Sequence, residues 1–308
     1  MGKIKLLIDT DIGDEIDDAL GLYLAMRMGL DIVGVTTVFG NTNERARISA
    51  MLMKAYGKGY ENIPVFAGFG TPPIESEREY AHTCHYVEEL CADKYKPSGE
   101  GDAAVDFMID CCKKYGRELV VVAIGPFTNI AKAIKKDAEA LSLAGKVVIM
   151  GGAYYKQYAD WNVCCDVEAA DIMFRGLDNL ECIGADVTHK LPLTRAQLDA
   201  LCSCECDGAA GLIAQWTRQW REVNPIRLPA LHDPLAVYYA ACPEVCRTEE
   251  QSVAVVTDGA ARGLTLNVDK YGKAYMNAWY EGASLPQHKV ACDVDADAFI
   301  ETFMSYFK

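Results

Sequence analysis

Short apolar runs alternate with segments of helical spacing along most of the chain. Ile4–Ile8 is a continuous apolar run, Ile16–Met28 has the spacing of an amphipathic helix, and Ile32–Val38 is β-branched and continuous. The alternation extends to the strand-like run Glu181–Ala185. Repeated strand–helix units predict a mainly parallel sheet with right-handed crossovers. Apolar strands without polar alternation indicate helices on both faces of that sheet.

Two strand-like runs near the C-terminus, Ser252–Val256 and Gly263–Val268, predict a small additional β-hairpin, and a third such run is Ala274–Ala278. The polar stretch Phe69–Gly101 interrupts the regular pattern, and long irregular loops of this kind are usually functional or disordered. No linker divides the chain. We therefore expect an α/β fold with one domain over residues 1–308, an open sheet flanked by helices.

The charge balance excludes one class of partner. The chain has 44 acidic and 30 basic residues, a net charge of −14, whereas a nucleic-acid surface requires a patch of Lys and Arg. No apolar run approaches the roughly 20 residues of a membrane span. We expect no nucleic acid or membrane partner, and we interpret the 13 cysteines as reduced, mostly buried thiols of a cytoplasmic protein. Cys202, Cys204 and Cys206 lack the second ligand pair of a zinc site.

Six acidic residues lie within ten positions, from Asp9 to Asp18, where the first predicted strand ends and the first helix begins. Ligands bind at this edge of open α/β sheets. Charge runs are usually solvated, but these acids directly follow a buried-type strand. Neighbouring carboxylates raise each other's proton affinity unless a positive charge lies among them. Oxygen ligands without Cys or His nearby favour Ca²⁺ or Mg²⁺ over zinc.

Polar groups also follow other predicted strands. Asn41 comes after the second strand, and Asp160-Trp161-Asn162 lies in the loop after Lys146–Met150. His232-Asp233-Pro234 stands at the start of a predicted helix, where Pro is favoured. A His-Asp pair there is most often a helix cap with a packed ring. Together these groups predict one cleft rich in acceptors, which suits a polyhydroxyl ligand and a cation.

Two alternatives remain open at this point. Asp9-Thr10-Asp11 resembles the nucleophile loop of haloacid-dehalogenase-like phosphatases, although Gly13 stands where those enzymes have Thr or Val. The cleft would also suit a non-catalytic protein that binds a nucleoside or ribose.

Eight segments together resemble motifs of the nucleoside hydrolases, the inosine-uridine-preferring ribohydrolase family, in the family's order. They are Asp9–Gly13 with Asp17-Asp18 (DxDPGxDD), Val35–Asn41 (TTVxGN), Ile63–Gly68 (VPVxxG), Gly125–Ala131 (GPLTNxA), Met150–Gly152 (MGG), Asp160–Asn162 (EFN), Asp166–Ala170 (DPEAA) and His232–Pro234 (HDP). The resemblance implies a nucleoside hydrolase-like fold, with Ca²⁺-dependent hydrolysis of the N-glycosidic bond of ribonucleosides to free base and ribose. It also implies a cytoplasmic enzyme of purine or pyrimidine salvage that is a homodimer or homotetramer.

The resemblance also implies residue roles. Asp11 would bind Ca²⁺ and act as general base on a metal-bound water, and the other ligands would be Asp18, Asp233 and the carbonyl of Ile124. The substrate-binding residues would be Asp17, Asn41, Asp160 and Asn162 at the ribose hydroxyls, Met150 under the sugar, and Trp161 as a stacking candidate. His232 would face the leaving base as a proton donor, and Asp9 would orient the site without touching the ligand. Trp216 and Trp220 are equally consistent with base stacking and with core packing.

The chain departs from the family pattern in three places. Ile12 replaces the usual Pro, and Asp160 replaces the usual Glu. Five residues separate Asp11 from Asp17 where the family has three. We align on the pair Asp17-Asp18 because it begins the helix, and the effect of the two extra residues is open. The resemblance leaves the base preference open and assigns no role to His82 and His85.

Overall fold

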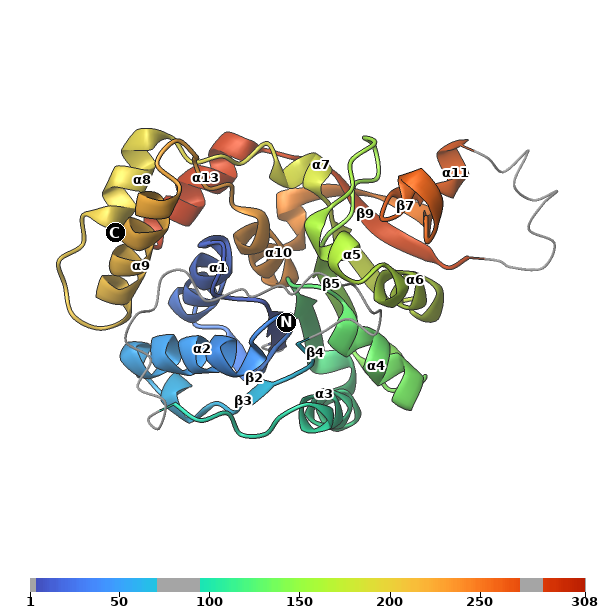
Figure 1. Cartoon of the computed structure of the whole chain (residues 1–308), viewed down its shortest axis with the longest axis horizontal. Coiled ribbons are helices and arrows are strands. Elements are labelled where there is room, and N and C mark those ends of the chain that lie inside the picture. Colours follow the sequence, from blue (N-terminus) through green and yellow to red (C-terminus); the bar gives the residue numbers. More distant parts are fainter. Residues whose placement is uncertain (1–3, 71–94, 272–284, 308) are drawn as a thin grey trace.

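The computed structural model describes residues 4–70, 95–271 and 285–307. Its centre is a sheet of nine strands in the order β3-β2-β1-β4-β5-β6-β9-β7-β8 (Figure 1). The strands are β1 (Lys5–Thr10), β2 (Asp31–Thr37), β3 (Val65–Ala67), β4 (Leu119–Ala123), β5 (Lys146–Met150), β6 (Leu180–Ile183), β7 (Cys246–Val255), β8 (Thr265–Asn267) and β9 (Gln287–Val294). All pairs from β3 to β9 in this order are parallel, and β7 is antiparallel to both of its neighbours. The predicted open, mainly parallel α/β sheet is confirmed.

The predicted hairpin exists, but it is not a separate addition. β7 and β8 pair from Val253 opposite Asn267 to Val255 opposite Thr265. β9 connects this hairpin to the main sheet, because it pairs with β6 on one side and with β7 on the other. Sequence analysis missed β9, whose first residues, Gln287-His288-Lys289, are polar. The run 274–278 and most of the stretch 69–101, including His82 and His85, lie outside the described residues.

Helices cover both faces of the sheet, as the apolar strands predicted (Figure 1). Along β1, Leu6 and Ile8 belong to one core, whereas Leu7 belongs to the core on the opposite face. The first core includes residues of α1 (Asp17–Arg27), α2 (Thr42–Tyr56), α8 (Arg195–Cys202), α9 (Ala209–Val223), α10 (His232–Ala241) and α13 (Ala296–Ser305). The second includes residues of α3 (Asp102–Tyr115), α4 (Thr128–Lys136) and α6 (Val167–Gly176). In the described part of the chain, no helix is long and apolar enough to cross a membrane.

Short helices follow two of the central strands. α5 (Trp161–Cys165) lies after β5, within a segment that we expected to be a loop, and α7 (Ala185–Thr188) comes directly after β6. Asp160 caps α5, because its side chain accepts a hydrogen bond from the backbone N–H of Val163. A third short helix, α11 (Val268–Tyr271), follows β8.

The prediction that the cysteines are reduced is wrong for two of them. Cys204 and Cys206 form a disulfide in the connection between α8 and α9. The other described cysteines are free thiols, and they range from buried to exposed. The two sulfurs are only two residues apart in sequence, so a local turn is sufficient to bring them together.

The fold decides between the two interpretations of the α9 tryptophans. Trp216 and Trp220 are 1% and 0% exposed and belong to the core on the α1 face of the sheet.

We therefore expect Trp216→Ala to lower the free energy of unfolding by about 3–5 kcal/mol, because it leaves a large cavity. Urea denaturation measures this. As a control, Ile226→Ala at an 89% exposed position should change stability by less than about 0.5 kcal/mol; equal effects of both substitutions would contradict the packing role.

Candidate active site

A cavity of about 600 Å³ opens at the carboxyl edge of the parallel strands. Its lining comes from the segments after β1, β4, β5 and β6 and from the connection between α9 and α10. The predicted site residues that line it are Asp11, Asp17, Asp18, Ile124, Met150, Asp160, Trp161, Asn162, His232 and Asp233. Segments far apart in sequence therefore meet at the edge where the strand order predicted a site.

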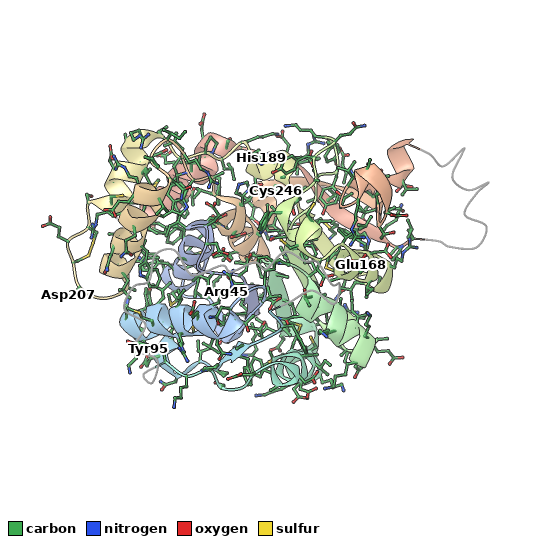
Figure 2. The ribbon with its side chains drawn as sticks, in the orientation of Figure 1. Arg45, Tyr95, Glu168, His189, Asp207 and Cys246 are labelled. Carbon is green, nitrogen blue, oxygen red and sulfur yellow. A yellow bond between two sulfur atoms is a disulfide. The ribbon has the colours of Figure 1, made fainter. Side chains whose placement is uncertain are left out.

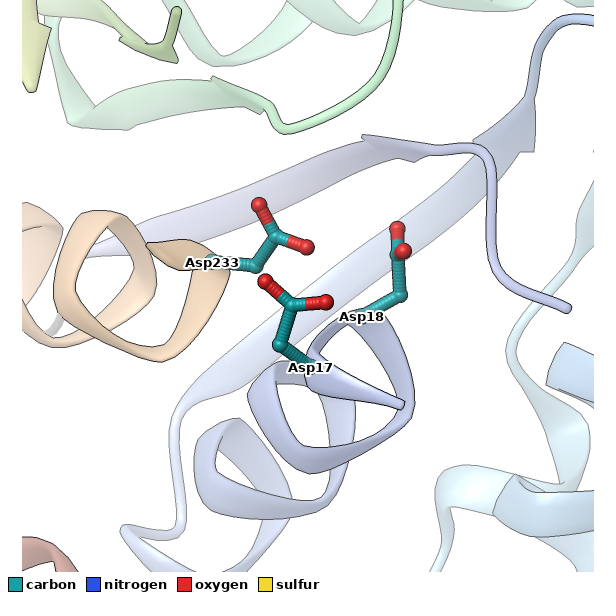
Figure 3. A group of neighbouring side chains, drawn as sticks. All are labelled: Asp17, Asp18 and Asp233. Carbon is teal, nitrogen blue, oxygen red and sulfur yellow. The ribbon is translucent and has the colours of Figure 1, made fainter. Parts of the chain in front are cut away.

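Three aspartates form the centre of the cavity wall. Asp17 and Asp18 belong to the first turn of α1, and Asp233 belongs to the first turn of α10 (Figure 3). Each offers one carboxylate oxygen, and these three atoms lie within 4.8 Å of one another. All three residues are buried, and Thr10 donates a hydrogen bond from its hydroxyl to Asp18. Asp11 lines the same cavity but lies outside this group of three.

The burial of these carboxyl groups has an electrostatic cost. Burial raises the pKa of Asp11 to about 6 and that of Asp17 to about 7. It raises the pKa of Asp18 and Asp233 well above the usual range, and the neighbouring aspartates raise both further. A divalent cation removes this cost because it stabilises the ionised forms. The oxygen-only donor set fits a hard ion of the Ca²⁺ or Mg²⁺ type.

Arg45 holds the loop that carries these acids. It lies on α2, is 1% exposed and is labelled in Figure 2. Its guanidinium donates to the backbone carbonyls of Asp11, Ile12 (3.1 Å) and Phe39 (2.6 Å). It also forms an ion pair with Asp14 at 2.6 Å. The charge of Arg45 lowers the pKa of Asp11, which partly offsets the effect of burial.

Asp9 lies beneath the cavity and does not line it. Its Oδ1 accepts hydrogen bonds from the Thr36 hydroxyl at 2.6 Å and from the Asn129 amide at 2.8 Å. Asn129 also donates to the carbonyl of Thr37 and accepts from the N–H of Phe69. Asp9 is fully buried, and burial raises its pKa to about 7. It therefore helps to tie together the ends of β1, β2 and β3.

Close backbone packing fixes the position of Asp11 from the β4 side. Gly125 is the second residue after β4, and a Cβ there would lie 2.9 Å from the backbone nitrogen of Asp11 and 3.0 Å from its Oδ1. Only a glycine permits this approach. The GPFTN motif thus contributes to the site through the size of Gly125 and the hydrogen bonds of Asn129.

The β5 side of the cavity presents acceptors. Burial raises the pKa of Asp160 to about 6, although backbone N–H groups at the start of α5 favour its ionised form. Asn162 donates from its amide nitrogen to the carbonyls of Ile124 at 2.9 Å and Met150 at 3.1 Å. Its side-chain oxygen is therefore the atom with which it can accept a hydroxyl. The carbonyl of Ile124 keeps a second lone pair for another partner.

Aromatic rings also line the cavity. His232 is the first residue of α10, and its Nδ1 lies 2.6 Å from the Thr188 hydroxyl. Its ring contacts that of His189 edge to face at 5.4 Å, and His189 contacts Tyr158 in the same way at 5.1 Å. Burial lowers the pKa of His232 to about 4, so its imidazole is neutral at neutral pH. Trp161 lies at the rim and is 51% exposed.

Asn41 lies elsewhere among the described residues. It caps α2, where its side chain accepts from the N–H of Glu44 at 3.2 Å, and it is exposed and does not line the cavity.

Sequence analysis missed several residues of the site. Arg45 gave no signal, because a lone arginine in a helix is usually solvated. Tyr158, His189 and Arg227 all line the cavity, but they lie outside the segments that we interpreted as motifs. His189 directly follows the short helix α7, which the sequence analysis did not identify either.

Comparisons with known proteins identify a family of similar sequences and folds. Residues 6–301 match the family model described as inosine-uridine preferring nucleoside hydrolase. The chain is 31% identical to the probable uridine nucleosidase 2 of Arabidopsis thaliana, with 97% of this chain and 96% of that protein covered. It resembles the structure of a plant nucleoside hydrolase with a TM-score of 0.81 at 28% identity, covering 99% of both chains. A purine-preferring ribonucleoside hydrolase from Gardnerella vaginalis gives a TM-score of 0.78 at 28% identity, covering 98% of both.

The contacts of Arg45 lead to a stability prediction. Arg45→Met removes a buried cation together with its ion pair to Asp14 and its hydrogen bonds to three carbonyls, so we expect a loss of about 3 kcal/mol in the free energy of unfolding. The double variant Arg45→Met/Asp14→Asn should lose less, because it also removes the negative charge that Arg45 neutralises. Chemical denaturation of both variants measures the difference. A single variant as stable as the wild type would show that Arg45 does not hold the loop.

Proposed function

The chain belongs to the family of inosine-uridine preferring nucleoside hydrolases, and we propose that it hydrolyses ribonucleosides by a Ca²⁺-dependent mechanism with Asp11 as general base. As a member of this family it is a hydrolase that acts on the N-glycosidic bond of ribonucleosides. One observation carries the proposal: a single cavity holds a buried cluster of carboxylates and a set of hydroxyl acceptors.

The proposed ligands of the cation are the carboxylates of Asp11, Asp18 and Asp233 and the carbonyl of Ile124. Asp18 and Asp233 belong to the group of three close carboxylates, and Ile124 and Asp11 line the same cavity. When bound, Ca²⁺ would lower the proton affinity of a water beside it and neutralise the buried acids. Asp17 is the third member of the close group. Its carboxylate would lie beside the cation and would also accept a hydrogen bond from a ribose hydroxyl.

Asp11 is the proposed base. The cleavage passes through a sugar with oxocarbenium character, and water attacks its anomeric carbon. Asp11 takes one proton from that water. Burial supports this role, because it raises the pKa of Asp11 and makes the carboxylate a better proton acceptor near neutral pH. Arg45 and Gly125 fix its backbone.

The ribose would lie against the β5 side. Asp17, Asp160 and the side-chain oxygen of Asn162 would accept hydrogen bonds from its hydroxyls, with Met150 beneath the ring. Negative charge around the sugar also stabilises the positive charge that develops during cleavage. Asn41 keeps its proposed role only if it leaves its capping position, because its side chain now accepts from Glu44.

The leaving base would lie among the aromatic rings. We expected His232 to donate a proton to it, but burial keeps its imidazole neutral at neutral pH, so His232 would face the base and donate a hydrogen bond. Trp161 would stack on the base. The base preference is not part of the proposal, since the names of the similar proteins include both a uridine nucleosidase and a purine-preferring enzyme. Salvage of purines or pyrimidines in the cytoplasm, by a homodimer or homotetramer, is proposed from the resemblance and the thiol content.

The structure argues against the phosphatase alternative. Its nucleophile would be Asp9, which is fully buried, has Oδ1 engaged by two donors and does not line the cavity. The remaining alternative is a nucleoside-binding protein without turnover. A reducing-sugar assay on a panel of nucleosides distinguishes that protein from an enzyme.

We expect Asp11→Ala to abolish most turnover while the fold survives, because the substitution removes the base but leaves the contacts of its backbone. The reducing-sugar assay measures turnover, and circular dichroism with a thermal melt checks the fold. Near-wild-type hydrolysis by this variant would refute the role of Asp11 as base.

Metal removal provides a separate test. Activity should fall after treatment with a chelator and return with Ca²⁺. Asp18→Asn should weaken Ca²⁺ binding by at least about tenfold, since it removes a charged ligand. Isothermal titration calorimetry measures the affinity directly. If the wild-type protein bound no Ca²⁺ in this experiment, the proposed ligand set would be wrong.

A further inference from the structure

Glu15 connects two sides of the cavity. It is one of the acids in the loop between Asp11 and Asp17, which is two residues longer than the family pattern. Its carboxylate accepts a hydrogen bond from the indole nitrogen of Trp220 at 2.9 Å and one from Arg227 at 2.7 Å. Both donors belong to α9 or to the segment that follows it.

That segment, residues 224–230, forms a cavity wall between α9 and α10 without regular secondary structure. Asn224, Arg227, Leu228, Pro229 and Ala230 line the cavity. Its backbone is bonded at several points: the N–H of Asn224 donates to Trp220 at 3.0 Å, the N–H of Arg227 donates to Asn224 at 3.2 Å, and the carbonyl of Pro229 accepts from Leu193 at 2.9 Å. Ala230 also forms an isolated bridge with Pro192. These bonds join the segment to α9 and to residues 192–193, whereas a side-chain bond joins it to the loop before α1.

Arg227 is the centre of this restraint. Besides its bond to Glu15, it donates to the side-chain oxygen of Asn224 at 3.0 Å. Its guanidinium also lies over the ring of Trp220, 5.8 Å from the centroid. Trp220 is buried in the core, so this ring contact fastens the wall to a fixed point of α9, and the bond to Glu15 fastens it to the loop before α1.

We propose that Glu15 is a positioning residue, which holds the wall 224–230 at a set distance from the ribose-binding carboxylates and thereby determines the affinity for the nucleoside. The inference rests on the proposed function of the cavity. The two acids in the middle of the loop then have distinct structural roles. Asp14 anchors the loop to α2 through its ion pair with Arg45. Glu15 anchors the wall 224–230 to the loop through its ion pair with Arg227.

A surface ion pair alone would contribute little, and the side chains of Glu15 and Arg227 are 46% and 56% exposed. The bond to Trp220 is different, because its donor belongs to a fully buried side chain. Removal of the acceptor leaves that N–H without the partner it has here, which costs more than the loss of an exposed pair. Glu15 therefore contributes a hydrogen bond to a buried side chain in addition to its exposed ion pair with Arg227.

The test compares Glu15→Ala with Glu15→Gln, which keeps an acceptor oxygen for Trp220. A hydrogen bond of this kind corresponds to about a tenfold change in binding. We expect Glu15→Ala to raise KM about tenfold with kcat changed less than about twofold, and Glu15→Gln to raise KM less. The indole N–H resonance of Trp220 in the NMR spectrum should shift in Glu15→Ala, without any substrate.

The matched control is Arg221→Gln. Arg221 also lies on α9 and forms an ion pair, but with Asp199 of α8, and it does not line the cavity. This variant should leave KM unchanged. A double-mutant cycle separates positioning from direct contact: in an Arg227→Gln background, Glu15→Gln should add little to KM. A full additional effect would show that Glu15 acts on KM independently of Arg227, and it would overturn the positioning role.

The outcomes distinguish this inference from the proposed function. An active wild-type enzyme whose Glu15→Ala variant keeps its KM overturns the positioning role alone, as does a loss confined to kcat. An unshifted Trp220 resonance in Glu15→Ala overturns the contact itself. A wild-type protein that cleaves no nucleoside, with or without Ca²⁺, overturns the proposed function and this inference with it.

Discussion

Carboxyl groups buried side by side impose the main constraint on this molecule. Asp17, Asp18 and Asp233 bring their oxygens within 4.8 Å of one another, with little access to solvent. Such an arrangement is unfavourable for ionised acids unless positive charge compensates it. The nearby positive contributions are Arg45 and the first turns of α1 and α10. The cation proposed above would complete this compensation.

The scaffold meets this constraint with parallel strands. Because β1, β4, β5 and β6 run in the same direction, their following segments gather at one edge, and each contributes part of the cavity. Fixed contacts beneath the edge keep the acids in place. Asp9 and Asn129 tie the strand ends together, while Arg45 binds the backbone of the acidic loop. These contacts therefore stabilise an arrangement in which neighbouring carboxylates, which repel each other when ionised, stay close together.

Sequence analysis predicted the fold class and ten residues of the cavity, because their signals are local. Continuous apolar strands reveal a covered parallel sheet, and acids after such a strand mark its functional edge. It failed where the structural reason lies far away in the chain. β9 begins with polar residues, yet it pairs with β6 on one side and with β7 on the other. Arg45 contributes to the site because it donates hydrogen bonds to the carbonyls of Asp11 and Phe39. The order of residue types along the chain does not show that these groups lie close together.

The place of β9 has a consequence for the order in which the molecule folds. β7 is synthesised before β9, yet it joins the main sheet through that later strand. A molecule in which residues 287–294 are not yet docked would therefore expose the edge of β6. An open strand edge is a template for unwanted pairing between chains. Docking of β9 therefore protects the edge of β6 and provides the edge to which β7 pairs.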